Sequence, residues 1–99
     1  MFALMISEFR DWLRSRTNRN GRPFQADTVS VYADAAIALD AWMTAEGVDA
    51  DFTVCGTKML NRFFAAYFAG HGRGGTSTKQ RNLRHLFSWL EREHDHPHP

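Results

Sequence analysis

Apolar residues recur every three or four positions in four separate stretches of the chain. This spacing is typical of amphipathic helices whose apolar stripe faces a core, so we expect four core-facing helices and no cofactor pocket among the stripes. The stripes consist of Phe2, Ile6, Phe9 and Leu13; Val29, Tyr32, Ala36, Leu39 and Met43; Leu60, Phe63, Phe64, Tyr67 and Phe68; and Leu83, Leu86, Phe87 and Leu90.

Polar and glycine residues between the stripes indicate where the helices begin and end. Asp27 is expected to cap the second helix and Gly47 to stop it. At about 19 residues and ~1.5 Å per residue, this helix is nearly 30 Å long and should form the backbone of the domain. The third helix begins near Gly56 and ends in the turn "GHGRGG". Ser77 and Gln80 form a capping box that should open the fourth helix.

No stretch alternates with period two for long enough to make a strand, and no repeat is present. The predicted fold is therefore all-α, a compact four-helix bundle. The chain has 99 residues, 43% of them hydrophobic, which suffices for one core. We expect the domain to span 1–93, and 94–99, "HDHPHP", to be a linker, because this tail has two prolines and little apolar content.

Two features of the composition bear on the compartment. No apolar run approaches the ~20 residues that a membrane span needs, so no membrane partner is expected. Cys55 has no second cysteine with which to form an internal disulfide. Both features favour a cytoplasmic protein in which Cys55 is a passive thiol.

The net charge of +1 hides a segregation of charges along the chain. Residues 1–25 hold five arginines and two acids, 26–55 hold six acids and no Lys or Arg, and 56–99 hold seven basic residues and three acids. Basic ends around an acidic middle suit an anionic partner at one face. The same pattern lets the segments attract each other, and the sequence does not choose between the two.

The predicted fourth helix carries its basic residues opposite its apolar stripe. At 100° per residue, the outer side holds Thr78, Arg81, His85, Ser88 and Arg92, with Asn82 and Arg84 at the flanks. Thr76, Ser77, Thr78 and Lys79 would surround the helix N-terminus, whose free N–H groups suit a phosphate. Arg81 and Arg84 are placed to reach base edges or further phosphates. An ordinary solvated face would show the same pattern, so both interpretations stay open.

Other chemistry has little support in the sequence. His94, His96 and His98 alternate through a tail without cysteines or a helical histidine pair, so we favour a linker over a metal site. "HGRGG" follows a helix and not a strand, unlike a dinucleotide-binding loop. No motif fixes a nucleophile beside a base. We therefore expect no catalytic residue, metal or cofactor in this segment.

The order of these features resembles the N-terminal core-binding domain of tyrosine recombinases, the phage integrase type, over essentially the whole chain. The motifs are "DTVSVYADAAIALDAW", with Thr28 and Tyr32, and "GTSTKQRNLRHLFSWLEREHDHP". In the second motif the matching positions are Ser77, Thr78, Lys79, Arg81, Leu83, Arg84, Leu86, Phe87, Trp89, Leu90, Glu91, Arg92, Glu93 and Pro97.

The resemblance implies a four-helix SAM-like domain that lies across one face of double-stranded DNA. A separate catalytic domain of the same full-length chain would close on the other face, and several protomers would assemble on DNA for recombination. The implied DNA-binding residues are Thr28, Ser30, Ser77, Thr78, Lys79, Arg81, Asn82, Arg84 and His85. The His-x-x-Arg motif of the catalytic domain is absent, so this segment alone would not be an enzyme, and Tyr32 and Tyr67 would be core residues.

The acidic second helix departs from the family pattern. Asp34 on its outer face would be repelled by phosphate, so this helix should touch DNA only through its first turn. The loop arginines are expected either to supply the missing positive charge or to neutralise the acidic helix; they are Arg14, Arg16, Arg19 and Arg22. An alternative function is a helical protein-interaction module that pairs with another chain through exposed aromatics, without binding DNA.

Overall fold

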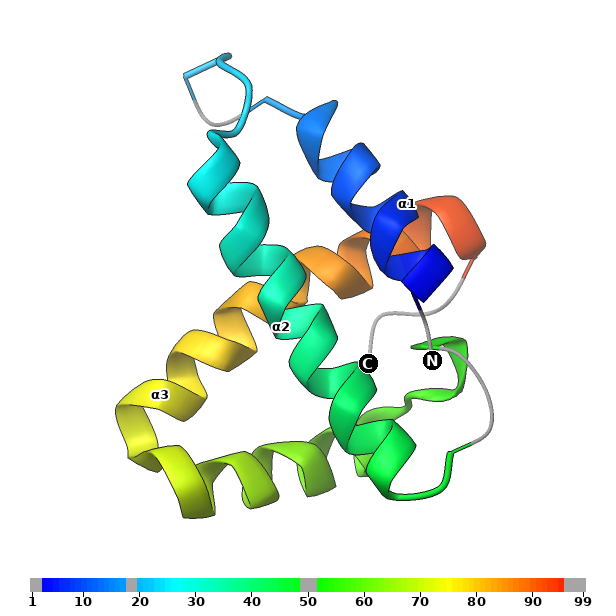
Figure 1. The fold of residues 1–99 in the computed structure, drawn as a ribbon, viewed down its shortest axis with the longest axis vertical. Helices are drawn as coiled ribbons and strands as arrows, with labels where there is room; N and C mark the ends of the chain where they lie inside the picture. The colour runs from blue at the N-terminus through cyan, green and yellow to red at the C-terminus, as the bar shows by residue number, and fades with distance from the viewer. Residues whose placement is uncertain (1–2, 18–19, 49–51, 96–99) are drawn as a thin grey trace.

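The computed structural model describes residues 3–17, 20–48 and 52–95. These form α1 (Ala3–Arg14), α2 (Ala26–Ala45), the short 3-10 helix η1 (Phe52–Val54) and α3 (Thr57–His94). In the described part of the chain the only β pairing is an isolated bridge between Thr17 and Pro23. The prediction of an all-α fold is confirmed. Helix α2 runs through the middle of the molecule, with α1 on one side and α3 wrapping around the other (Figure 1).

Helix α3 is bent at Gly72, where φ is 74° and ψ is −175° inside an otherwise helical run. Such a conformation is almost confined to glycine, because a Cβ would clash with the backbone. The bend divides α3 into a first arm (57–71) and a second arm (73–94), which meet at a sharp angle (Figure 1). The predicted third and fourth helices thus correspond to two arms of one helix, and three α-helices are present among the described residues.

The predicted capping box is wrong, because Ser77 lies inside the second arm. The helix resumes directly after Gly72, five residues earlier than expected. The hydroxyls on either side of Ser77 bond back along the helix: Thr76 donates to the Gly72 carbonyl at 2.7 Å and Thr78 to the Gly74 carbonyl at 3.1 Å. Hydroxyl-to-i−4 bonds of this kind belong to helix interiors and not to N-caps.

The two ends of α2 differ in how well the sequence predicted them. Gln25, not Asp27, occupies the N-cap, and no side chain caps the helix there. Asp27 lies in the first turn, where its negative carboxylate interacts favourably with the positive end of the helix dipole. The stop at Gly47 is confirmed: its φ is 77°, its N–H donates to Thr44, and the Val48 N–H donates to Met43. These two bonds form a Schellman motif.

The core lies where the three helices meet. The predicted stripe residues that are buried there are Ile6, Phe9, Leu13, Val29, Ala36, Leu39, Met43, Phe63, Leu83, Leu86, Phe87 and Leu90. Phe2 lies outside the described residues, and Tyr32, Leu60, Phe64 and Tyr67 are partly buried at the core's edge. Phe68 is an exception, because 54% of it is exposed.

The segment between α2 and α3 adds two residues to the core. Phe52 of η1 and Cys55 are both fully buried. Burial disfavours the thiolate and raises the pKa of Cys55 to about 11. The expectation of a passive thiol agrees with this environment.

One ion pair bears on the attraction between charged segments. The guanidinium of Arg62, on the first arm of α3, lies 3.1 Å from the carboxylate of Glu46 at the end of α2. Both side chains are exposed, so the pair contributes less than about 1 kcal/mol to stability. The basic and acidic segments therefore do contact each other, although weakly.

The C-terminal end of α3 is His94, followed by Asp95 with a left-handed φ of 51°. The N–H of Asp95 donates to the Leu90 carbonyl and closes the last turn. Residues 96–99, most of the predicted linker with His96 and His98, lie outside the described residues. Among the described helices none is both long and apolar enough to cross a membrane.

Candidate nucleic-acid interface

The second arm of α3 presents two arginines on the side opposite the core. Leu83, Leu86 and Leu90 hold the arm in the core, while Arg81 and Arg84 are exposed. Neither guanidinium pairs with a carboxylate of the described residues, whose ion pairs involve Arg14 and Arg62. Ser77, one turn before Arg81, is exposed on the same side. This outer face therefore offers two uncompensated cations and a hydroxyl to solvent.

Two predicted DNA-binding residues from different helices meet beside this face. Thr28, in the first turn of α2, and Asn82, on the second arm, line one open hollow of about 320 Å³. The other lining residues are Asp27, Val31 and Tyr32. The structure thus brings the start of α2 next to the second arm.

Ser30 is not brought to this hollow. It is exposed on α2, but it follows Thr28 by two positions and points about 200° around the helix from it. Its hydroxyl is on a different side of α2 from Thr28 and Asn82. Of the two α2 residues that the resemblance implied, only Thr28 lies at the interface with the second arm.

Lys79 and Thr78 make contacts within the domain. The Lys79 ammonium lies 5.2 Å from the centroid of the Tyr67 ring, so this half-buried lysine joins the two arms of α3 by a cation–π contact. Thr78 is exposed, but its hydroxyl donates to the Gly74 carbonyl. Both residues support the bend of α3, and neither presents a free polar group as Arg81 does.

His85 packs between helices and is only partly exposed to solvent. Its imidazole stacks on the Tyr32 ring, with centroids 3.8 Å apart, and meets the edge of Phe24 at 6.3 Å. Burial lowers the pKa of His85, and the positive charge of Arg16 lowers it further. His85 is therefore neutral at neutral pH, and it ties α2 to the second arm.

Arg16 is a loop arginine that the structure places near the second arm. Its guanidinium lies 4.5 Å from the centroid of the Trp12 ring, and its charge acts on His85. Arg14 instead pairs with Asp11 at 3.1 Å within α1, so it does not neutralise α2, and Arg19 lies outside the described residues. The spacing of Trp12 and Arg16, one helical turn, is the sequence signal that would have singled out Arg16.

The phosphate site expected at Thr76 to Lys79 is not formed there. Since the second arm begins after Gly72, its unpaired N–H groups belong to residues 73–75. Thr76 is only 8% exposed. The helix N-terminus is therefore displaced toward the bend, away from Arg81 and Arg84.

Comparisons of this chain with protein-family models, with curated proteins and with solved structures find no match.

Proposed function

We propose that this chain is a DNA-binding domain of a site-specific tyrosine recombinase, which holds double-stranded DNA for a separate catalytic domain. The observation that carries the proposal is the exposed, unpaired state of Arg81 and Arg84 next to the hollow shared by Thr28 and Asn82. Guanidinium groups bind phosphates and guanine edges, and hydroxyl and amide groups add hydrogen bonds to backbone or bases.

The binding mode follows from the geometry of the second arm. An α-helix fits the major groove of B-DNA, and residues one turn apart on its outer side meet successive phosphates or base edges. With about four to six phosphate contacts, the domain should bind nonspecific duplex with a Kd of roughly 10⁻⁴ to 10⁻⁶ M. Binding should weaken steeply with salt, by about 0.9 in log K per contact for each unit of log salt.

The SAM-like arrangement of four helices is part of the same proposal. Counted separately because of the break at Gly72, the two arms of α3 bring the number of α-helical segments to four, which supports the proposal of a SAM-like recombinase domain. We also propose that a catalytic domain in the same full-length chain and further protomers complete the assembly on DNA. This segment alone would bind and not cleave.

The acidic residues of α2 limit how this helix can take part. Asp27 lies at the hollow and Asp34 is exposed further along α2. Carboxylates near phosphates are repelled, so α2 would contribute only through Thr28 in its first turn. The second arm and Arg16 would supply most of the attraction.

A titration of the ¹⁵N-labelled domain with a short duplex tests the proposal. We expect amide shifts at low salt that cluster around Thr28, Arg81 and Arg84 and that disappear as salt rises. Shifts confined to the rest of α2, or none at low salt, would refute it. A poly-glutamate peptide of equal length serves as control, because a general polyanion effect would reproduce the shifts.

A second candidate, a protein-interaction module, is favoured by an apolar groove between α2 and the first arm. Small residues leave space there beside aromatic rings; the lining is Ala38, Ala41, Trp42, Phe63, Ala66, Tyr67, Gly70 and His71. Phe68 is 54% exposed on the same arm. Sedimentation at micromolar concentration distinguishes the candidates: self-association lost in Phe68→Ser, without any effect of DNA, would favour this one.

A further inference from the structure

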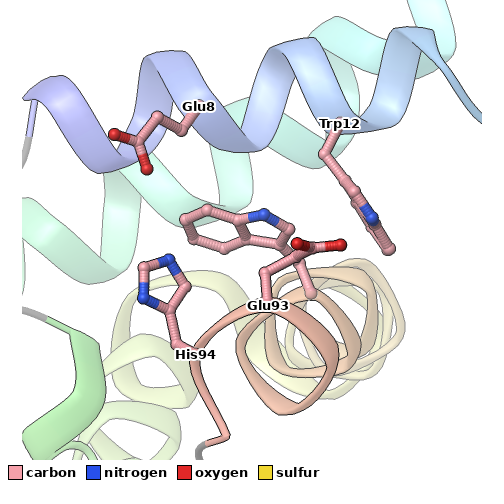
Figure 2. Close-up of a pocket in the computed structure, with 5 residues that line it drawn as sticks. Glu8, Trp12, Glu93 and His94 are labelled. Carbon is pink, nitrogen blue, oxygen red and sulfur yellow. The ribbon is translucent and has the colours of Figure 1, made fainter.

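A second hollow lies between α1 and the end of α3 and has a different chemistry. It measures about 360 Å³ and is lined by Glu8, Trp12, Trp89, Glu93 and His94. Each helix contributes one glutamate and one tryptophan, four residues apart and therefore on one face. Figure 2 shows Glu8 on α1 and Glu93 with His94 at the end of α3, around the same opening.

The two carboxylates of this hollow are not neutralised within the domain. Glu8 and Glu93 are both exposed, and neither pairs with a basic side chain of the described residues. They come from helices far apart in sequence, yet both border one opening. Two negative charges over aromatic rings favour a cation and disfavour any phosphate.

Trp89 adds a polar group that has no partner. Only 2% of this residue is exposed, yet it lines the hollow. Its indole N–H makes no hydrogen bond to the described residues, and in that part of the chain no fully buried side-chain nitrogen or oxygen lacks a partner. The indole nitrogen must therefore keep some exposure, and the hollow is where Trp89 borders open space. Trp89 lines the hollow and therefore brings to it a hydrogen-bond donor that the described residues do not use.

We propose that this hollow binds an arginine side chain of a polypeptide partner. A guanidinium has five N–H donors in a planar fork, which can serve Glu8 and Glu93 together. The Trp89 N–H would donate a hydrogen bond to a backbone carbonyl of the partner. Arg16 already covers the Trp12 ring, at 4.5 Å from its centroid, so the incoming guanidinium is assigned to the two carboxylates.

The two carboxylates of this site are separate from the residues proposed to contact DNA. They lie at the α1–α3 junction, whereas DNA binding is proposed for Thr28, Arg81 and Arg84; Arg16, which lies over Trp12 of the hollow, borders both. Loss of one activity therefore leaves the other to be measured in the same protein.

The test is a titration of the ¹⁵N-labelled domain with N-acetyl-arginine methylamide, observed at the tryptophan indole signals. The chain has three tryptophans, so these signals are few and can be assigned by single substitutions. We expect the Trp89 signal to shift with a Kd on the order of 1 mM, as befits a small ligand at an open site that gains about 0.3 kcal/mol per non-hydrogen atom, while the Trp42 signal stays in place. The citrulline analogue has the same shape without the charge and should cause no comparable shift.

Three variants complete the experiment. Glu8→Gln and Glu93→Gln should each weaken binding by about twofold to fivefold, the range expected for exposed ion pairs. Glu91→Gln, an exposed change on the same arm outside the hollow, should leave the Kd unchanged. Equal shifts with citrulline, no Trp89 shift at about ten times the expected Kd, or an unaltered Kd in both glutamine variants would overturn the proposal.

Discussion

The imidazole of His85 stacks on the phenol ring of Tyr32, with ring centroids 3.8 Å apart and 17° between the ring planes. The contact joins the second arm of α3 to the first half of α2. The Phe24 ring packs against the side of this contact. Its centroid lies 5.9 Å from that of Tyr32, and the two ring planes are nearly perpendicular. A charged imidazolium in this place would lose hydration and would be repelled by Arg16.

Stability should therefore depend on pH through His85. Its pKa in the folded state is lowered from the ordinary 6.5, so the unfolded chain binds this proton more readily. The contribution of His85 is fully present above pH 6.5 and is lost as pH falls through the lowered folded-state pKa. We expect the urea midpoint, followed by circular dichroism, to decrease as pH falls from neutral through 6.5 and below it.

His85→Gln should flatten that pH profile. His71→Gln is the matched control, because His71 also stacks on a tyrosine, Tyr67, with centroids 3.9 Å apart, but is exposed. The control should keep the slope of the wild type. If both variants keep it, His85 is not the titrating group.

The helical pattern predicted most of the core because each buried stripe repeats every three or four residues. Leu83, Leu86 and Leu90 are buried as that period requires. The pattern could not locate the bend in α3, since "GHGRGG" offers four glycines and only packing decides that Gly72 alone leaves the helix. The wrong cap at Ser77 has the same origin, because a capping box is inferred from local residues while the helix had already begun upstream.

The candidate site was predicted in part. Arg81, Arg84 and Ser77 are exposed on the side opposite the apolar stripe, which a helical wheel can tell. The positions of Lys79 and His85 depend on rings from other segments, Tyr67 and Tyr32. Neither ring belongs to the predicted fourth helix, so reasoning from that helix alone could not include these contacts. The sequence therefore indicated which residues are polar and basic, while the tertiary contacts decide which of them are free.

Removing both arginines of the outer face should weaken DNA binding more than removing two other positive charges. The double variant Arg81→Ala with Arg84→Ala is expected to lower the slope of log K against log salt by about 1.8, two lost phosphate contacts. Arg10→Ala with Lys58→Ala makes the same change in net charge elsewhere. Fluorescence anisotropy with a labelled duplex measures both. Equal weakening by the two pairs would mean that only net charge matters.

Gly72 and Gly74 should respond to alanine in opposite directions. At Gly72, with φ of 74°, a Cβ strains the backbone, so Gly72→Ala should destabilise the domain by about 1–3 kcal/mol. At Gly74 the φ is ordinary and an added Cβ would have no neighbouring atom within 4 Å, so Gly74→Ala should stabilise by up to about 1 kcal/mol. Urea unfolding measures both changes. A neutral Gly72→Ala would show that the bend relaxes without cost.

Cys55 should report on opening of the core. It is fully buried, and burial raises its pKa to about 11, so about a thousandth of the thiol is ionised at pH 8 even before access is considered. Since the chain has one cysteine, Ellman's reagent measures this site alone. In native protein the reaction should be slow and limited by opening, and in concentrated urea it should finish within the mixing time. Leu86→Ala, which leaves a cavity in the same core at a cost of about 2–5 kcal/mol, should accelerate the native reaction markedly. A fast reaction in the native wild type would contradict the buried environment of the thiol.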